Sequence, residues 1–148
     1  MPTMETTASL PREKGSGIRW KRVVLAAFLS EAGVIMVLLA VTTIYGFAIA
    51  PGRTDAEYQE FAEMAGYYVA PATGALMTFL SVLWVAMKLE SNFIANGVLV
   101  GVVSVLLTVG FLFGARPEHR MMYVIAYILR IAAGYLGGFV AQKRSTHA

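Results

Sequence analysis

The sequence predicts an all-α fold, a polytopic membrane protein whose four transmembrane helices form one bundle. Of its 148 residues, 57% are hydrophobic and 14% are charged, a composition too apolar for an ordinary soluble domain of this size. Four apolar stretches are each long enough to cross the ~30 Å hydrocarbon core of a bilayer. Lys and Arg gather beside these stretches, as they do at the ends of membrane spans.

The first span is expected at residues 23–50, a stretch of 28 residues whose only charge is Glu31. Residues 1–17, which mix small polar residues with Pro and Gly, predict a disordered cytoplasmic tail. A secretory signal peptide is the alternative for the first segment, but the apolar core of such peptides has only about 7 to 15 residues. We therefore expect the segment to remain in the protein as a span.

A helix is predicted to begin at Thr54, because Thr54 and Glu57 have the spacing of a capping box. This helix could lie on the membrane surface or run straight into the second span, which is expected at residues 67–87. Pro71 lies within that span and predicts a kink, because proline removes one intrahelical hydrogen bond. After a polar turn, the third span is expected at residues 93–114.

The fourth span is expected at residues 121–141 and carries Arg130 near its middle. A central arginine costs about 2.5 to 3.5 kcal/mol on the insertion scale, and strongly apolar residues each return about 0.3 to 0.6 kcal/mol. The span has eight such residues, so the two contributions nearly cancel. We therefore expect Arg130 to face partners inside the bundle. The single membrane domain would cover residues 18–144, and residues 145–148 would form a second cytoplasmic tail.

The distribution of Lys and Arg predicts the orientation. Eight of these residues lie on the side that holds both termini, and three lie on the opposite side. The positive-inside rule then places both termini in the cytoplasm and the chain in the plasma (inner) membrane as a multi-pass protein.

Glu31 and Arg130 are the two charged residues inside the predicted spans, and intramembrane charges are candidates for function. They could form an ion- or proton-sensitive pair that a ligand rearranges. They could equally form a structural salt bridge that fixes the first span against the fourth. The sequence leaves both interpretations open.

Glycines spaced for close helix contact mark the third and fourth spans. We expect helix packing at Gly97, Gly101, Gly110, Gly114, Gly134, Gly137 and Gly138.

Two resemblances accompany these features. The second half of the chain resembles small four-span prokaryotic membrane proteins of unknown function, on the polar turn at residues 88–92, the segment Asn96–Gly101 and the closing segment Gly134–Lys143. The sequence around Glu31, LSEAGV, is similar to the first span of small multidrug-resistance transporters, whose membrane carboxylate Glu31 would match. The Trp- and Pro-bearing stretches of that family are missing from the second and third spans.

Several classes of function have no support in the sequence. The chain has no Cys, and its two histidines, His119 and His147, lie singly in a loop and a tail, so neither a metal nor a cofactor is expected. No catalytic motif is present, so we do not expect an enzyme. The net charge of +3 comes from residues beside the spans, which argues against nucleic acid as a partner.

Two functions remain as hypotheses. The first is a non-catalytic accessory or scaffold subunit that binds a larger membrane protein through its glycine-rich helix faces. The second is a small homo-oligomeric transporter or channel, proton-coupled or not, that uses Glu31 and Arg130. Its partners would be the lipid bilayer and further copies of the chain, because a bundle of this size offers little room for a pathway.

Overall fold

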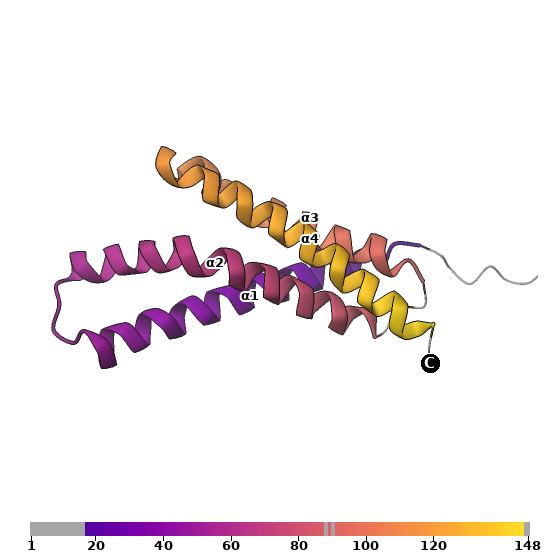
Figure 1. Cartoon of the computed structure of the whole chain (residues 1–148), viewed down its shortest axis with the longest axis horizontal. Helices are drawn as coiled ribbons and strands as arrows, with labels where there is room; N and C mark the ends of the chain where they lie inside the picture. Colours follow the sequence, from indigo (N-terminus) through magenta and orange to yellow (C-terminus); the bar gives the residue numbers. More distant parts are fainter. Residues whose placement is uncertain (1–16, 88, 90, 147–148) are drawn as a thin grey trace, which may run out of the picture.

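The computed structural model describes residues 17–87, 89 and 91–146, and the predicted fold class is confirmed (Figure 1). Residues 1–16 of the tail predicted at residues 1–17 lie outside the described residues, as does His147. Each of the four long helices is long and apolar enough to cross a membrane. The elements are α1 (Trp20–Ile44), a π-helical turn η1 (Tyr45–Ile49), α2 (Asp55–Ala86), α3 (Phe93–Gly114), a 3-10 turn η2 (Pro117–His119) and α4 (Arg120–Ser145).

The helices differ from the expected spans mainly at their ends. The acidic segment after Thr54 runs straight into the second span, so α2 is one helix of 32 residues that passes through Pro71 without ending. α1 begins at Trp20, and α4 continues to Ser145, beyond the predicted end of the fourth span. The bounds of α3 coincide with those expected for the third span.

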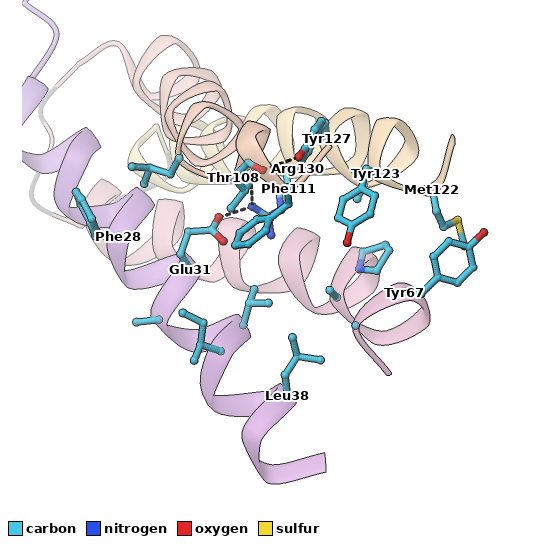
Figure 2. A pocket seen from close by; sticks show the side chains of 18 residues that line it. Phe28, Glu31, Leu38, Tyr67, Thr108, Phe111, Met122, Tyr123, Tyr127 and Arg130 are labelled. Carbon is cyan, nitrogen blue, oxygen red and sulfur yellow. Dashed lines mark hydrogen bonds and ion pairs between the residues drawn. The ribbon is translucent and has the colours of Figure 1, made fainter. Parts of the chain in front are cut away.

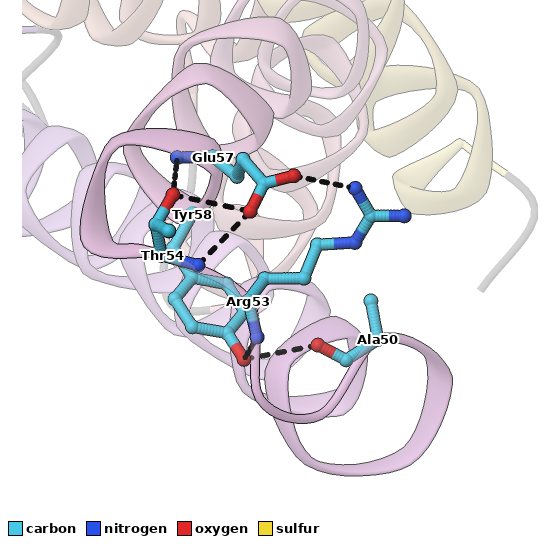
Figure 3. A network of polar contacts seen from close by, with 5 residues as sticks. All are labelled: Ala50, Arg53, Thr54, Glu57 and Tyr58. Atoms are coloured by element: carbon cyan, nitrogen blue, oxygen red, sulfur yellow. Dashed lines mark hydrogen bonds and ion pairs between the residues drawn. The ribbon is translucent and has the colours of Figure 1, made fainter.

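The start of α2 has the expected capping box (Figure 3). The Glu57 backbone N–H donates to Thr54 Oγ1 at 3.4 Å, and the Thr54 N–H donates to Glu57 Oε2 at 2.9 Å. The pKa of the Glu57 carboxyl is lowered by the hydrogen bonds that the carboxylate accepts, first from the Thr54 backbone N–H and then from the Thr54 hydroxyl and Arg53. Glu57 lies in the charged first turn of α2, ahead of its apolar part. The Tyr58 hydroxyl donates to the carbonyl of Ala50, and Arg53 pairs with Glu57 at 2.8 Å. The connection between α1 and α2 is therefore held by local polar contacts.

The four helices form two hairpins, α1–α2 and α3–α4, that cross each other (Figure 1). α4 packs on both α2 and α3, while α1 packs on α2 and α3. The hairpins lie close together at the end of the bundle that holds both described ends of the chain. They diverge toward the α1–α2 and α3–α4 connections.

The close end is tight because glycines let the α3 and α4 backbones meet. A Cβ atom added to Gly97 would lie 2.3 Å from the carbonyl oxygen of Gly134, and one added to Gly138 would lie 2.6 Å from the carbonyl oxygen of Phe93. Gly101 meets the Arg130 backbone in the same way, at 2.8 Å. Such distances leave no room for a side chain, so these positions require glycine.

The two predicted packing glycines at the diverging end have different surroundings. A Cβ atom added to Gly110 or Gly114 would meet nothing within 4 Å. Gly137, by contrast, faces Val82 of α2 at 2.9 Å. Of the seven glycines selected from the sequence, Gly110 and Gly114 therefore make no helix contact within the described chain. Both are exposed, because they lie on a different face of α3 from the buried Gly97 and Gly101.

The apolar core also lies at the close end. It is a cluster of small residues from α1, α2 and α3 with exposed fractions of 7% or less: Val23, Ala26, Ala27, Val82, Val85 and Val100. Buried polar groups beside it are hydrogen-bonded across helices, as Ser30 is to Thr78 at 3.0 Å. The side chain of Asn96 accepts from the Arg19 backbone N–H at 3.1 Å. This half of the bundle is closed to water.

Candidate functional site

Glu31 and Arg130 meet at the point where the hairpins begin to separate (Figure 2). Arg130 Nη1 donates to Glu31 Oε1, which joins α4 to α1 through their side chains. The same nitrogen donates to the hydroxyl of Thr108 in α3 at 3.2 Å. The Arg130 side chain is 6% exposed and the Glu31 side chain is 14% exposed. The structure thus brings together the two residues that the sequence selects as candidates.

Arg130 fits into the bundle because α2 has a glycine opposite it. A Cβ atom at Gly74 would lie 2.6 Å from Arg130 Nε and 2.9 Å from Nη2. The guanidinium group is therefore packed against the α2 backbone on one side and hydrogen-bonded to α1 and α3 on the other. Arg130 Nε is buried and has no hydrogen-bond partner among the described residues. The same is true of the Ser104 hydroxyl oxygen.

Thr108 is held in place by its own hydrogen bonds. Its hydroxyl donates to the carbonyl of Ser104 at 2.9 Å, and its carbonyl accepts from the Tyr127 hydroxyl at 2.8 Å. The Thr108 oxygen can accept from Arg130 while it donates to the backbone, because a hydroxyl is both donor and acceptor. Residues of α3 and α4 thereby position the arginine that Glu31 binds.

A cavity of about 550 Å³ lies next to the ion pair, between the two hairpins (Figure 2). All four helices contribute to its lining, and both Glu31 and Arg130 are part of it. The other lining residues are mainly apolar or aromatic, and the rings come from Phe28, Tyr67, Phe111, Tyr123 and Tyr127. We call this cavity the cleft. Its volume falls in the range of sites that bind small molecules, about 300 to 1,000 Å³.

The two charges are not equally available from the cleft. Arg130 uses Nη1 for Glu31 and Thr108, and the rest of its guanidinium faces Gly74. Glu31 is the more exposed of the two, and none of the described residues donates a hydrogen bond to its Oε2. A ligand or a proton that enters the cleft therefore meets the carboxylate as the accessible charged group.

The sequence did not identify the cleft or several residues that build it. Gly74 and Thr108 position Arg130, but neither had a signal beyond being a small residue in a span. Tyr67 and Tyr123 also line the cleft, a position that their sequence surroundings do not indicate. A single bundle was expected to have little room for a transport pathway, and that expectation stays a prediction; the cleft is a cavity that lies within one chain. The reason is the divergence of the hairpins, which no local pattern encodes.

His119 contacts a residue of the cleft lining, Tyr67. It was expected to be a solvated loop residue, but the structure places it half-buried in η2, with its ring 4.5 Å from that of Tyr67 between centroids. Among the residues that the structure describes, no group of three or more His, Cys, Asp or Glu side chains could hold a metal ion.

Comparison of the chain with protein-family models, with curated proteins and with solved structures finds no match.

Proposed function

We propose that the chain is a small membrane transporter that takes a ligand into the cleft and binds it next to Glu31. The observation that carries this proposal is the position of the cleft, which reaches a buried charged pair inside a bundle of four candidate spans. Glu31 is 11 residues from the start of α1, or ~16 Å along the helix axis, which is about half the hydrocarbon thickness. A pair at that depth is costly unless it serves packing or function.

The ion pair can link ligand binding to the arrangement of the hairpins. Glu31 belongs to one hairpin and Arg130 to the other, so their bond is a direct tie between the two. A proton or a ligand donor that occupies the carboxylate weakens the attraction for Arg130. The equilibrium between arrangements then shifts by the difference in binding free energy. Proton coupling would use this same step.

The proposed topology gives the cleft a direction. With both termini in the cytoplasm of a plasma membrane, the diverging ends of the hairpins would face the outside. The close end, with its glycine contacts and small apolar core, would then separate the cleft from the cytoplasm. Because the chain has no natural Cys, single cysteines at Arg53 or Lys143 can be labelled from either side of the membrane to test this orientation.

The test of the proposed function is a ligand screen by thermal stabilisation in detergent, followed by transport of any hit in proteoliposomes. A ligand at 100 times its Kd stabilises a protein by about 2.7 kcal/mol. We expect a hit to stabilise the unmodified protein and to lose this effect in Glu31→Gln and in Ala70→Trp, which fills the cleft. Arg53→Gln, remote from the cleft, is the matched control. Equal stabilisation of Ala70→Trp and the unmodified protein by every hit would reject a binding role for the cleft.

An accessory or scaffold role is the second candidate, because one surface of α3 remains unpacked. Gly110 and Gly114 are four residues apart and meet nothing within 4 Å, and Phe111 and Phe113 beside them are exposed. A partner helix could approach closely there. Crosslinking in native membranes with mass identification would test it. Recovery of a larger partner that Gly110→Ile abolishes would favour this role, and recovery of the chain alone would count against it.

A further inference from the structure

Two side-chain contacts join the hairpins near their diverging ends, and one of them involves Tyr67, which lines the cleft. Arg116, just before η2, pairs with Glu63 of α2 at 3.5 Å. His119, at the end of η2, contacts the ring of Tyr67 of α2. We call the four residues of these two contacts, Glu63, Tyr67, Arg116 and His119, the outer latch.

The spacing within each element matches the two contacts. Glu63 and Tyr67 are four residues apart and so lie on one face of α2. Arg116 and His119 are three apart in the turn that η2 forms, where the His119 N–H donates to the Arg116 carbonyl at 2.9 Å. One short turn of the second hairpin therefore presents two side chains in register with two side chains of the first.

The outer latch has an inner and an outer layer. In the inner layer, Tyr67 lines the cleft and is half-buried together with His119. In the outer layer, the side chains of Arg116 and Glu63 are 67% and 47% exposed. An ion pair this exposed contributes little to stability, so thermal motion breaks it often. The outer layer can therefore open without disturbing the core.

The opposite end of the bundle is suited to act as the fixed point of such an opening. There the α3 and α4 backbones touch through Gly97 and Gly134, and the small apolar core joins α1, α2 and α3. Tight packing of this kind resists deformation. Movement between the hairpins is thus easier at the outer latch, because Arg116 follows the end of α3 opposite to the one that holds Gly97.

We propose that the outer latch holds the hairpins together at the mouth of the cleft, and that its opening limits access to the cleft. Opening of the outer latch would regulate access to the site where the proposed function places the ligand. The biological role of the outer latch rests on that proposed function. Access itself can be measured without knowing any ligand.

The test uses a single cysteine in the cleft, which the absence of natural Cys makes simple. Ala70→Cys, at a position in the cleft lining, is labelled in proteoliposomes with a sulfonated, membrane-impermeant maleimide. We expect Arg116→Gln to raise the labelling rate about two- to fivefold, the range that corresponds to loss of an exposed ion pair. His119→Ala should raise it as well, by opening the inner layer. Arg53→Gln, which breaks the equally exposed Arg53–Glu57 pair inside one hairpin, should leave the rate unchanged.

A charge exchange separates the pair from a general loosening of the fold. Glu63→Arg combined with Arg116→Glu should return the labelling rate to that of the Ala70→Cys protein, because the pair is restored with its charges reversed. An unchanged rate in Arg116→Gln, or an equal increase in Arg53→Gln, would overturn the latch while leaving the cleft accessible. If the variants label as expected but the ligand screen finds no stabilising ligand, the result would count against the proposed function and leave the outer latch supported. No labelling in any variant would overturn both.

Discussion

Removing one member of the buried pair should destabilise the protein unequally, depending on which charge is left behind. Breaking a buried pair costs about 3 to 5 kcal/mol, because the remaining charge is uncompensated. In Glu31→Gln the remaining charge is Arg130, which is 6% exposed and is left without a carboxylate partner among the described residues. In Arg130→Met it is Glu31, which is 14% exposed, lines the cleft and can be hydrated there or take up a proton. We therefore expect a loss of about 3 kcal/mol or more for Glu31→Gln, and about 1 to 3 kcal/mol for Arg130→Met.

The double variant Glu31→Gln with Arg130→Met should be more stable than Glu31→Gln alone, with a coupling energy of about 2 kcal/mol. The assay is reversible unfolding in mixed detergent micelles, with all four proteins under the same conditions. The same cycle on Arg53 and Glu57 is the control, and it should give no measurable coupling because that pair is exposed. Additive losses from Glu31 and Arg130 would refute the pairing. A larger loss for Arg130→Met than for Glu31→Gln would refute the unequal exposure from which the order is derived.

Three further predictions use the same unfolding assay. Gly97→Ala should lower the free energy of unfolding by about 1 to 3 kcal/mol, because its Cβ would lie 2.3 Å from the Gly134 carbonyl oxygen. Gly110→Ala should be neutral or slightly stabilising, because nothing lies within 4 Å of its Cβ position. Equal effects of the two substitutions would contradict the difference in packing between the two ends of the bundle. Gly74→Ala should displace the Arg130 guanidinium and destabilise the unmodified protein more than the Arg130→Met variant, and an identical loss in both would show that Gly74 acts elsewhere. Thr54→Ala should cost about 0.5 to 2 kcal/mol through the lost cap. Because the pKa of Glu57 is lowered in the folded chain, the ionised Glu57 carboxylate stabilises the fold at neutral pH, and this stabilisation is lost as the pH falls below about 4.5. Thr54→Ala should therefore weaken the decrease in the free energy of unfolding at acidic pH. An unchanged decrease would count against the cap.

The parts of the fold that depend on local composition could be predicted from the sequence. Apolar length gives the four helices, because each must satisfy its backbone polar groups internally in a membrane. The bounds of α3 follow from the turn before Phe93 and the polar segment after Gly114. The capping box at Thr54 sets the start of α2 through hydrogen bonds within four residues. What it does not set is whether the helix stops before the second span, which depends on contacts with the other hairpin.

The candidate site was only half predictable, for a related physical reason. Charge inside a span is costly wherever it occurs, so Glu31 and Arg130 could be selected from the sequence alone. Their contact depends on the crossing of two hairpins and on the space that Gly74 leaves in α2. The cleft depends on where the helices separate, and helix periodicity carries no information about that distance.

The distribution of glycines explains why the bundle is closed at one end and open at the other. At the close end each glycine meets a backbone on a facing helix, as Gly97 meets Gly134 and Gly138 meets Phe93, so the helix axes can approach. Those contacts lie within the α3–α4 hairpin, and small residues also join the two hairpins at this end, where Gly137 faces Val82 and the Val and Ala core connects α1, α2 and α3. At the diverging end, the cleft between the hairpins is lined instead by large rings such as Phe111 and Tyr123. With small residues between the hairpins at one end and large rings at the other, the two hairpins form a wedge. Arg130 lies at the apex of that wedge, where the space is just sufficient for its guanidinium but not for a further side chain at Gly74.

A substitution that adds a side chain at the close end should therefore move the apex and loosen the ion pair. We expect Gly97→Ala to reduce the coupling energy between Glu31 and Arg130, although Gly97 contacts neither side chain. An undiminished coupling energy in the Gly97→Ala background would show that the wedge does not set the geometry of the pair.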